Sequence, residues 1–226
     1  SPFYVARQDL YHALILRIAR HAIEHPHRSI VGWACALFGI SMFRLLDDVP
    51  ACGRFGRHAL ALLEPDPSGP FTCKSTFTVG GTLQHWYAPI DEQLPTLNLS
   101  LRSGVESGDL VWAGYAASTI IYRLFSRGAP LSVVEKALRQ HLPFLERSQS
   151  PLLSITHGTR QMIRALRGQT PDPLSMSEPE TYDEVEVIGA LEATSFGYGV
   201  HMMALYKALL LLVQGEGDLA WPWIEK

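Results

Sequence analysis

Apolar positions along the chain fall at helical spacing, and almost wholly apolar segments alternate with amphipathic ones. Residues 71–146 give the clearest example. Phe71–Ala88 and Leu110–Phe125 are apolar, whereas Asp91–Gly108 and Leu131–Glu146 are more polar or amphipathic. Apolar residues that recur at i, i+3, i+4 and i+7 indicate amphipathic helices. The pattern therefore predicts two consecutive helix pairs in this stretch.

The same reasoning predicts about ten helices over the whole chain, hence an all-α fold. Further helices are expected at Val5–Glu24, Ile30–Leu46, Ala51–Leu63, Pro151–Leu166, Tyr182–Glu192, Ser195–Leu212 and, truncated by the chain end, Leu219–Lys226. A turn-rich connector is expected over residues 64–70, because its three prolines fix φ and forbid helix. Residues 169–181 are also rich in proline. They predict an extended, solvent-facing insertion loop.

The ends of the apolar segments recur at a steady interval of about 40 residues, as in helical-repeat proteins. They fall at Asp48, Pro89, Gly128, Gly168 and Gly215, the last after a longer step that contains the Pro-rich loop. Small residues within the segments recur at a similar interval, at Gly39, Gly80, Ser118 and Gly158. A hairpin cannot bury both faces of an apolar helix without neighbours. The period therefore predicts one domain over residues 1–226, built of stacked antiparallel hairpins; the alternative is an irregular helical bundle.

Composition narrows the function classes. Hydrophobic residues make up 47% of the chain and charged residues 18%, so some apolar surface is expected to meet another domain. The net charge is −3, and the sequence has no basic stripe of the kind that binds nucleic acid. No nucleic-acid partner is expected.

The cysteines and the apolar runs bear on location. Cys35, Cys52 and Cys73 are odd in number and form no Cys-x-x-Cys pair, which favours a reduced, cytoplasmic setting over a disulfide framework or a zinc site. Gly, Ser, Arg or His interrupts each apolar run before the roughly 20 residues that a membrane helix needs. The sequence therefore predicts a cytoplasmic chain that does not insert into a membrane.

A set of short motifs carries a family resemblance. These motifs are Leu63-Glu64-Pro65-Asp66-Pro67-Ser68-Gly69-Pro70, Gln84-His85-Trp86-Tyr87-Ala88-Pro89, Gln93-Leu94-Pro95, Gly108-Asp109, Ala113-Gly114-Tyr115-Ala116 and Leu142-Pro143-Phe144-Leu145-Glu146. Together they resemble the tetratricopeptide-like helical region of very large bacterial signalling proteins. In those proteins the region follows an AAA or STAND-type ATPase module and precedes GAF and sensor histidine kinase modules.

The resemblance covers nearly the whole chain and implies architecture and context. It implies a right-handed α-superhelix of tetratricopeptide type, although the interval in this chain is longer than the 34 residues of that repeat. Because the chain starts at Ser1-Pro2-Phe3 and stops within a helical pattern, we expect it to be a fragment excised from a longer protein. Neighbouring domains of that protein, another protein or a second copy are the expected partners.

Two groups of residues could bind a metal ion. His21, His25 and His27 include an i, i+4 pair that suits imidazole ligation, but cationic His at a helix end also complements the helix dipole. Asp47 and Asp48 are half of an acidic magnesium motif, and a solvated turn explains them more simply. We therefore expect no metal and no cofactor.

Seven residues form the candidate binding surface. They are His85, Trp86, Tyr87, Tyr115, Tyr122, Tyr198 and His201. Aromatic side chains on the first helices of stacked hairpins can line a groove and anchor a partner, but they can also complete a core. The chain has neither a Gly-x-Ser-x-Gly elbow nor a phosphate-binding Gly-x-x-x-x-Gly-Lys loop, so no catalytic residue is assigned.

Two functional hypotheses follow from these patterns. The first is a non-catalytic interaction and signal-relay domain that contacts a protein partner. The second is an all-helical small-ligand-binding domain or enzyme with a pocket lined by these aromatic and histidine residues.

Overall fold

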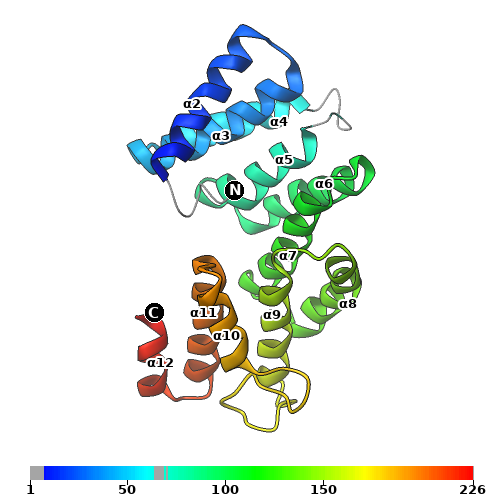
Figure 1. Ribbon diagram of the computed structural model, residues 1–226, viewed down its shortest axis with the longest axis vertical. Coiled ribbons are helices and arrows are strands. Elements are labelled where there is room, and N and C mark those ends of the chain that lie inside the picture. Colours follow the sequence, from blue (N-terminus) through cyan, green and yellow to red (C-terminus); the bar gives the residue numbers. More distant parts are fainter. Residues whose placement is uncertain (1–7, 64–68, 70, 226) are drawn as a thin grey trace. The chain divides into compact units, whose positions relative to one another are not determined.

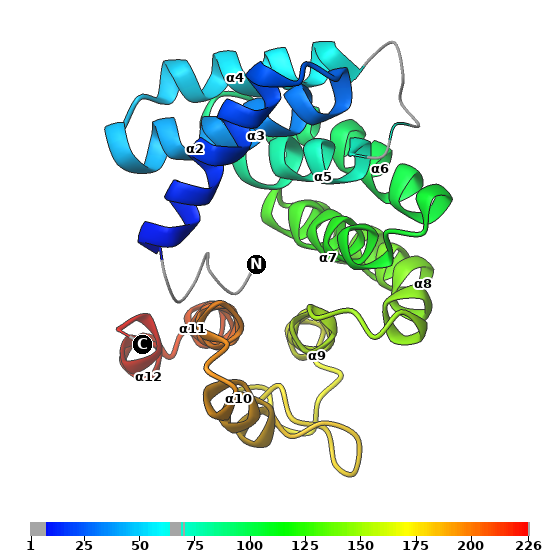
Figure 2. The ribbon, with the colours of Figure 1, turned by 45° about the horizontal axis from the view of Figure 1, so that its top comes forward.

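The computed structural model describes residues 8–63, 69 and 71–225. Its described part contains eleven α-helices and no strand, so the all-α prediction is confirmed. Figures 1 and 2 show the ribbon. The first predicted helix begins before the described residues, and the connector at 64–70 lies outside them except for Gly69.

The chain divides into two compact units, with the boundary between Arg127 and Gly128. This boundary falls at Gly128, one of the predicted ends of the apolar segments. Gly128 has a φ of 76°, a conformation that glycine adopts without steric cost. The continuous stack over residues 1–226 stays a prediction.

Unit 1 contains six α-helices among its described residues. They are α2 (Gln8–Glu24), α3 (Arg28–Leu46), α4 (Val49–Leu63), α5 (Thr72–Phe77), α6 (Ile90–Ser107) and α7 (Leu110–Ser126). Consecutive helices pack as hairpins, and α3 and α4 lie side by side along their lengths (Figure 2). The apolar helices also contact across the pairs, since α3 packs on α5, and α5 on α7.

The predicted apolar helix Phe71–Ala88 is not one α-helix. After α5 the chain continues as a π-helix, η1 (Thr78–Leu83), and a 3₁₀ turn, η2 (Gln84–Trp86). Thr78 and Thr82 donate hydroxyl hydrogen bonds to carbonyls four residues earlier, a bonding mode that disturbs helices. The Arg123 side chain on α7 donates to the Gly81 carbonyl at 3.1 Å. Local side-chain bonding and a tertiary contact therefore accompany the change in helix type.

The core of unit 1 forms where α3 meets α2, α4 and η1. Its buried residues are Ile15, Ala36, Leu37, Ile40, Cys52, Ala59, Val79 and Leu83. A Cβ at Gly39 would lie 2.9 Å from Leu83, too close for an unaltered contact. This close approach fits the expectation that small residues let helices pack tightly.

The helix α3 is long and apolar enough, over 19 residues, to cross a membrane. The sequence analysis had found no such segment. A central helix of a packed core passes the same test, and α3 packs against α2, α4, α5 and η1. The length and composition of α3 are therefore only weak evidence for a membrane-spanning helix.

Unit 2 contains α8 (Leu131–Arg147), α9 (Leu153–Leu166), α10 (Glu184–Ala193), α11 (Gly197–Val213) and α12 (Gly217–Ile224). The helix α11 packs against α9, α10 and α12. A buried hydrogen bond of 2.8 Å from the Thr159 hydroxyl to Tyr206 Oη joins α9 to α11. A Cβ at Gly158 would lie 2.4 Å from Met203 Sδ, so this glycine permits the close helix contact.

The segment between α9 and α10 contains no helix. Hydrogen bonds and an ion pair, described below, join it to the helices of unit 2. Within it, Glu178 and Tyr182 form an isolated antiparallel bridge. Glu180 lies at the tip of that turn with a φ of 62°. In Figure 2, α9 and α11 are seen end-on, with this segment and α10 on one side of the pair.

Candidate functional site

The seven predicted residues fall on both units. His85, Trp86, Tyr87, Tyr115 and Tyr122 belong to unit 1, whereas Tyr198 and His201 belong to unit 2. Only His85, Trp86 and Tyr87 form one local cluster, because they are consecutive at the end of η2. The residues must therefore be considered as separate surfaces.

Trp86 forms the centre of an aromatic surface on unit 1. Its side chain is 43% exposed. Its ring centroid lies 3.9 Å from that of Phe43 on α3 and 4.7 Å from that of His85. The 3₁₀ turn that ends η1 thus places Trp86 between Phe43 and His85, with one part of the indole still open to solvent.

His85 is neutral at physiological pH. Burial, and secondly the Arg123 guanidinium, lower the pKa of His85 to about 4. The ring nevertheless keeps an exposed edge, so its packed side accounts for the desolvation. A neutral imidazole can donate one hydrogen bond and accept another, but it brings no positive charge to this surface.

Tyr87 points inward and serves packing. A Cβ at Gly56 would lie 2.4 Å from the Tyr87 hydroxyl, and one at Gly53 would lie 3.2 Å from its ring. The hydroxyl is buried without a hydrogen-bond partner among the described residues. Burial is the main cause that raises the pKa of Tyr87 to about 12. The two glycines of α4 therefore create the space that this ring fills.

A cationic helix face borders the aromatic residues. The Arg57 guanidinium carbon lies 5.3 Å from the centroid of the Tyr87 ring, within range of a cation–π interaction. Arg54 lies one turn earlier on α4, and both arginines are exposed. We call Phe43, Arg54, Arg57, His85 and Trp86 the cationic–aromatic surface. The sequence analysis missed its arginines, although their i, i+3 spacing is visible in the sequence.

The other two tyrosines of unit 1 occupy separate places on α7. Tyr115 is half-buried and packs with Phe77 and Trp112, at centroid distances of 5.7 Å to each. Burial raises its pKa. Tyr122 lies below the Arg123 guanidinium, at 5.8 Å. Neither residue makes an aromatic contact with Trp86 among the described residues, so neither extends the cationic–aromatic surface.

Tyr198 and His201 lie near the start of α11 in unit 2. Tyr198 is 50% exposed and contacts Phe196 at 6.2 Å. His201 Nδ1 lies 2.7 Å from the Gly197 carbonyl oxygen, four residues earlier. Leu205 and Leu212 continue the same helix face and are also exposed. The exposed side chains of this face are therefore largely apolar.

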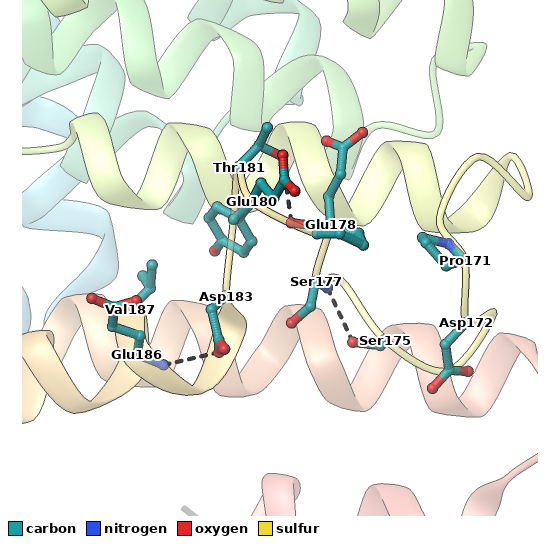
Figure 3. Close-up of a pocket in the computed structure, with 12 residues that line it drawn as sticks. Pro171, Asp172, Ser175, Ser177, Glu178, Glu180, Thr181, Asp183, Glu186 and Val187 are labelled. Atoms are coloured by element: carbon teal, nitrogen blue, oxygen red, sulfur yellow. Dashed lines mark hydrogen bonds between the residues drawn. The ribbon is translucent and has the colours of Figure 1, made fainter.

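The segment before α10 forms an acidic cleft of about 740 Å³ in unit 2. Figure 3 shows the carboxylates on the loop and on the first turn of α10. The carboxylates that line the cleft are Asp172, Glu178, Glu180, Asp183 and Glu186. None of the cleft's lining residues is a lysine or an arginine, so the cleft is strongly negative.

Bonds within the loop fix several of these groups. The Asp183 carboxylate accepts hydrogen bonds from the backbone N–H groups of Val185 and Glu186, at 2.8 and 3.1 Å, and thereby caps α10. The Ser177 N–H donates to Ser175 Oγ at 3.0 Å (Figure 3). The capping bonds hold the Asp183 carboxylate at a helix N-terminus, where negative charge is favourable.

Charged side chains of α9 and α11 hold the loop to the helices of unit 2. Arg164 on α9 donates to Glu178 Oε1 at 2.6 Å, and Gln161 donates to its other oxygen at 3.3 Å. These bonds, with Gln161 first, lower the pKa of Glu178. Lys207 on α11 pairs with Glu184 and donates to the Leu174 carbonyl at 2.7 Å.

The Pro-rich loop is therefore not the purely solvent-facing insertion that the sequence predicted. Met176 is fully buried, and its N–H donates to Glu184 Oε2 at 2.9 Å. The sequence analysis missed this arrangement. A signal existed, because Lys207 is the single Lys, Arg, Asp or Glu in the otherwise apolar α11, and a lone charge in such a helix requires a partner.

The two possible metal sites have simpler structural roles. Asp48 accepts a hydrogen bond from the Ala51 N–H at 2.8 Å and so supports the start of α4. His21 and His25 lie with ring centroids 4.7 Å apart at the end of α2. In the described residues, no three His, Cys, Asp or Glu side chains converge in a way that could hold a metal ion.

No model of a known protein family matches the chain, and no curated protein matches it significantly.

Proposed function

We propose that this chain is a non-catalytic protein–protein interaction and signal-relay domain. The cationic–aromatic surface of unit 1 is the observation that carries the proposal. It combines an exposed tryptophan, closely packed, tilted aromatic rings and two exposed arginines. Tryptophan, tyrosine and arginine dominate the binding energy of protein interfaces, so this surface has the composition of a binding site.

The wider context of the proposal comes from the sequence resemblance. We propose that the hairpins belong to a right-handed superhelix of tetratricopeptide type, in a cytoplasmic signalling protein with ATPase and histidine kinase modules. The contacts of α3 with α5, and of α5 with α7, are of the kind that stacked hairpins make. An interaction domain between such modules needs an exposed surface and no reactive group.

The alternative, a helical ligand-binding domain or enzyme, receives less support. It requires the predicted aromatic and histidine residues to line a common pocket. None of the seven lines the acidic cleft or the smaller cleft beside Pro26 and Leu63. Tyr87 fills a space between helices instead.

Binding measurements with Trp86→Ala test the proposal. A photo-crosslinking residue at position 54 identifies candidate partners, and each candidate is then purified and titrated against the chain. We expect Trp86→Ala to weaken the partner's affinity at least about tenfold, because hot-spot truncations cost about 2 kcal/mol or more. Trp221→Ala is the matched control, since Trp221 on α12 is also exposed, at 59%.

Equal affinity for wild type and Trp86→Ala, across every purified candidate, contradicts the proposal. A parallel thermal-shift screen with nucleotides, divalent metals and common metabolites addresses the alternative. A rise of several degrees with one small molecule favours a ligand-binding domain, whereas an unchanged melting temperature agrees with an interaction domain.

A further inference from the structure

We infer that the cationic–aromatic surface of one copy binds the acidic cleft of a second copy of this chain. The inference names a partner for the surface described above and therefore depends on the proposed function. It commits to one contact, in which Arg54 and Arg57 on α4 meet the carboxylates around Glu180 and Glu186.

The first argument is the state of the two arginines. Some exposed cations of unit 1 have partners, since Arg20 pairs with Glu24, and Arg127 with Asp91. No ion pair engages Arg54 or Arg57 within the described residues. The two side chains lie on one face of α4, and the Arg57 guanidinium lies over the ring of Tyr87, the residue after Trp86, so an incoming carboxylate would meet charge and aromatic surface together.

The second argument is the state of the cleft. Glu178 is paired with Arg164, and Asp183 caps α10, whereas Glu180 and Glu186 form no ion pair among the described residues. Both are exposed, and Glu180 occupies the tip of the turn. Arginine binds carboxylates through paired, charge-assisted hydrogen bonds, so this cleft suits guanidinium groups.

The third argument is that the cleft is held in shape before binding. The Arg164–Glu178 pair ties the loop to α9, and the Lys207 ammonium on α11 donates to the Leu174 carbonyl of the loop. A preorganised surface loses less conformational entropy on association than a mobile loop. The partner therefore does not have to order these carboxylates when it binds.

The distribution of charge along the chain agrees with this contact. Residues 1–127 contain 11 Lys and Arg against 10 Asp and Glu, whereas residues 128–226 contain 8 against 12. A positive surface in the first part and a negative one in the second give two copies complementary charge, which steers association and fixes its orientation. Because two different surfaces meet, the contact is heterologous and produces a ring or an open chain of copies.

Sedimentation velocity of the intact chain tests the inference. We expect the wild-type mass to rise with protein concentration at low salt and to fall when salt screens the charges. The charge reversals Arg54→Glu/Arg57→Glu and Glu180→Lys/Glu186→Lys are each expected to weaken self-association at least about tenfold, since both leave like charges opposed.

A mixture of the two variants gives the decisive measurement. In the mixture, the glutamates at positions 54 and 57 of the first variant can meet the lysines at positions 180 and 186 of the second, and the unchanged Arg54 and Arg57 of the second can meet Glu180 and Glu186 of the first. The mixture therefore restores opposite charges at these positions in every contact. We expect association to return in the equimolar mixture. Arg17→Glu/Arg28→Glu, which reverses two other exposed arginines of unit 1, should associate like the wild type. Circular dichroism checks that all variants remain helical.

A wild-type chain that stays monomeric at every concentration overturns the inference, and so does a mixture that fails to associate. Loss of association in the Arg17→Glu/Arg28→Glu control shows a general charge effect and also overturns it. The proposed function is tested by a separate result. If the wild type is monomeric but Trp86→Ala still weakens a purified heterologous partner, the interaction surface stands and only the second copy is excluded.

Discussion

Tyr206 and Tyr87 differ in whether the side-chain hydroxyl has a hydrogen-bond partner. Tyr206 Oη accepts a hydrogen bond from the Thr159 hydroxyl, whereas the Tyr87 hydroxyl has no partner among the described residues. A buried polar group without a partner keeps its desolvation cost. The same phenol ring therefore stabilises unit 2 through its hydroxyl, but stabilises unit 1 only through its carbon surface.

Removing each hydroxyl should change stability in opposite directions. We expect Tyr87→Phe to leave the free energy of unfolding unchanged or to raise it by about 1 kcal/mol, and Tyr206→Phe to lower it by about 1 kcal/mol. Urea unfolding followed by circular dichroism measures both. A clear loss of stability in Tyr87→Phe would show that its hydroxyl is bonded after all.

At the scale of the elements, a buried ion pair organises unit 2. The side chains of Lys207 and Glu184 are 11% and 10% exposed. Glu184 also accepts the Met176 N–H, and Lys207 also donates to Leu174. Two charges and two backbone groups thus satisfy each other where the Pro-rich loop meets α11. Burying such charges is tolerable only when every partner is present.

Breaking this pair should be costly. We expect Lys207→Met to lower the free energy of unfolding by about 3–5 kcal/mol, because it leaves the Glu184 carboxylate buried without its cation. The double variant Lys207→Met/Glu184→Leu should lose less than Lys207→Met alone.

The exposed pair Arg20–Glu24 provides the control for that experiment. Arg20→Ala should cost at most about 1 kcal/mol, since surface pairs contribute little. Urea unfolding compares the three variants, and hydrogen exchange reports on the loop. Equal losses for Lys207→Met and Arg20→Ala would contradict the role assigned to the buried pair.

At the scale of the whole molecule, several histidines respond to burial in the same way. Burial is the main cause that lowers the pKa of His12, His85, His141 and His157. Unit 1 and unit 2 each contain two of them. Because the folded chain then binds fewer protons than the unfolded chain near neutral pH and below, acid favours unfolding.

Stability should therefore fall as the pH drops below about 6.5, the ordinary histidine pKa. The loss should continue down to about 4, the pKa of His85. Above the ordinary value both states are neutral, so these groups add no pH dependence there. Thermal unfolding between pH 4 and 8 checks this, and His12→Gln should reduce the slope. A melting temperature that rises as pH falls from 7 to 5 would contradict the prediction.

The apolar periodicity alone predicts most of the helices and the break near Arg127. It does so because each helix must bury one stripe of side chains, and that stripe leaves a period in the sequence. Small residues such as Gly39 and Gly158 were expected to mark the repeat interval, and the structure places both at close helix contacts. The π-helix at Thr78–Leu83 was not predicted, because it involves a hydrogen bond from Arg123, 42 residues away from Gly81.

The candidate site, too, was predicted from the sequence only in part. Sequence alone singled out the run His85-Trp86-Tyr87, because consecutive polar aromatic residues are visible without any structure. It could not decide that Trp86 faces solvent while Tyr87 fills the space above Gly53 and Gly56, since both outcomes fit one helical pattern. Likewise, prolines excluded a helix from residues 169–181, but only folding brought Lys207 to Glu184. Local propensity and periodicity can be read from the sequence, whereas burial and charge pairing depend on which distant residues come into contact in the folded chain.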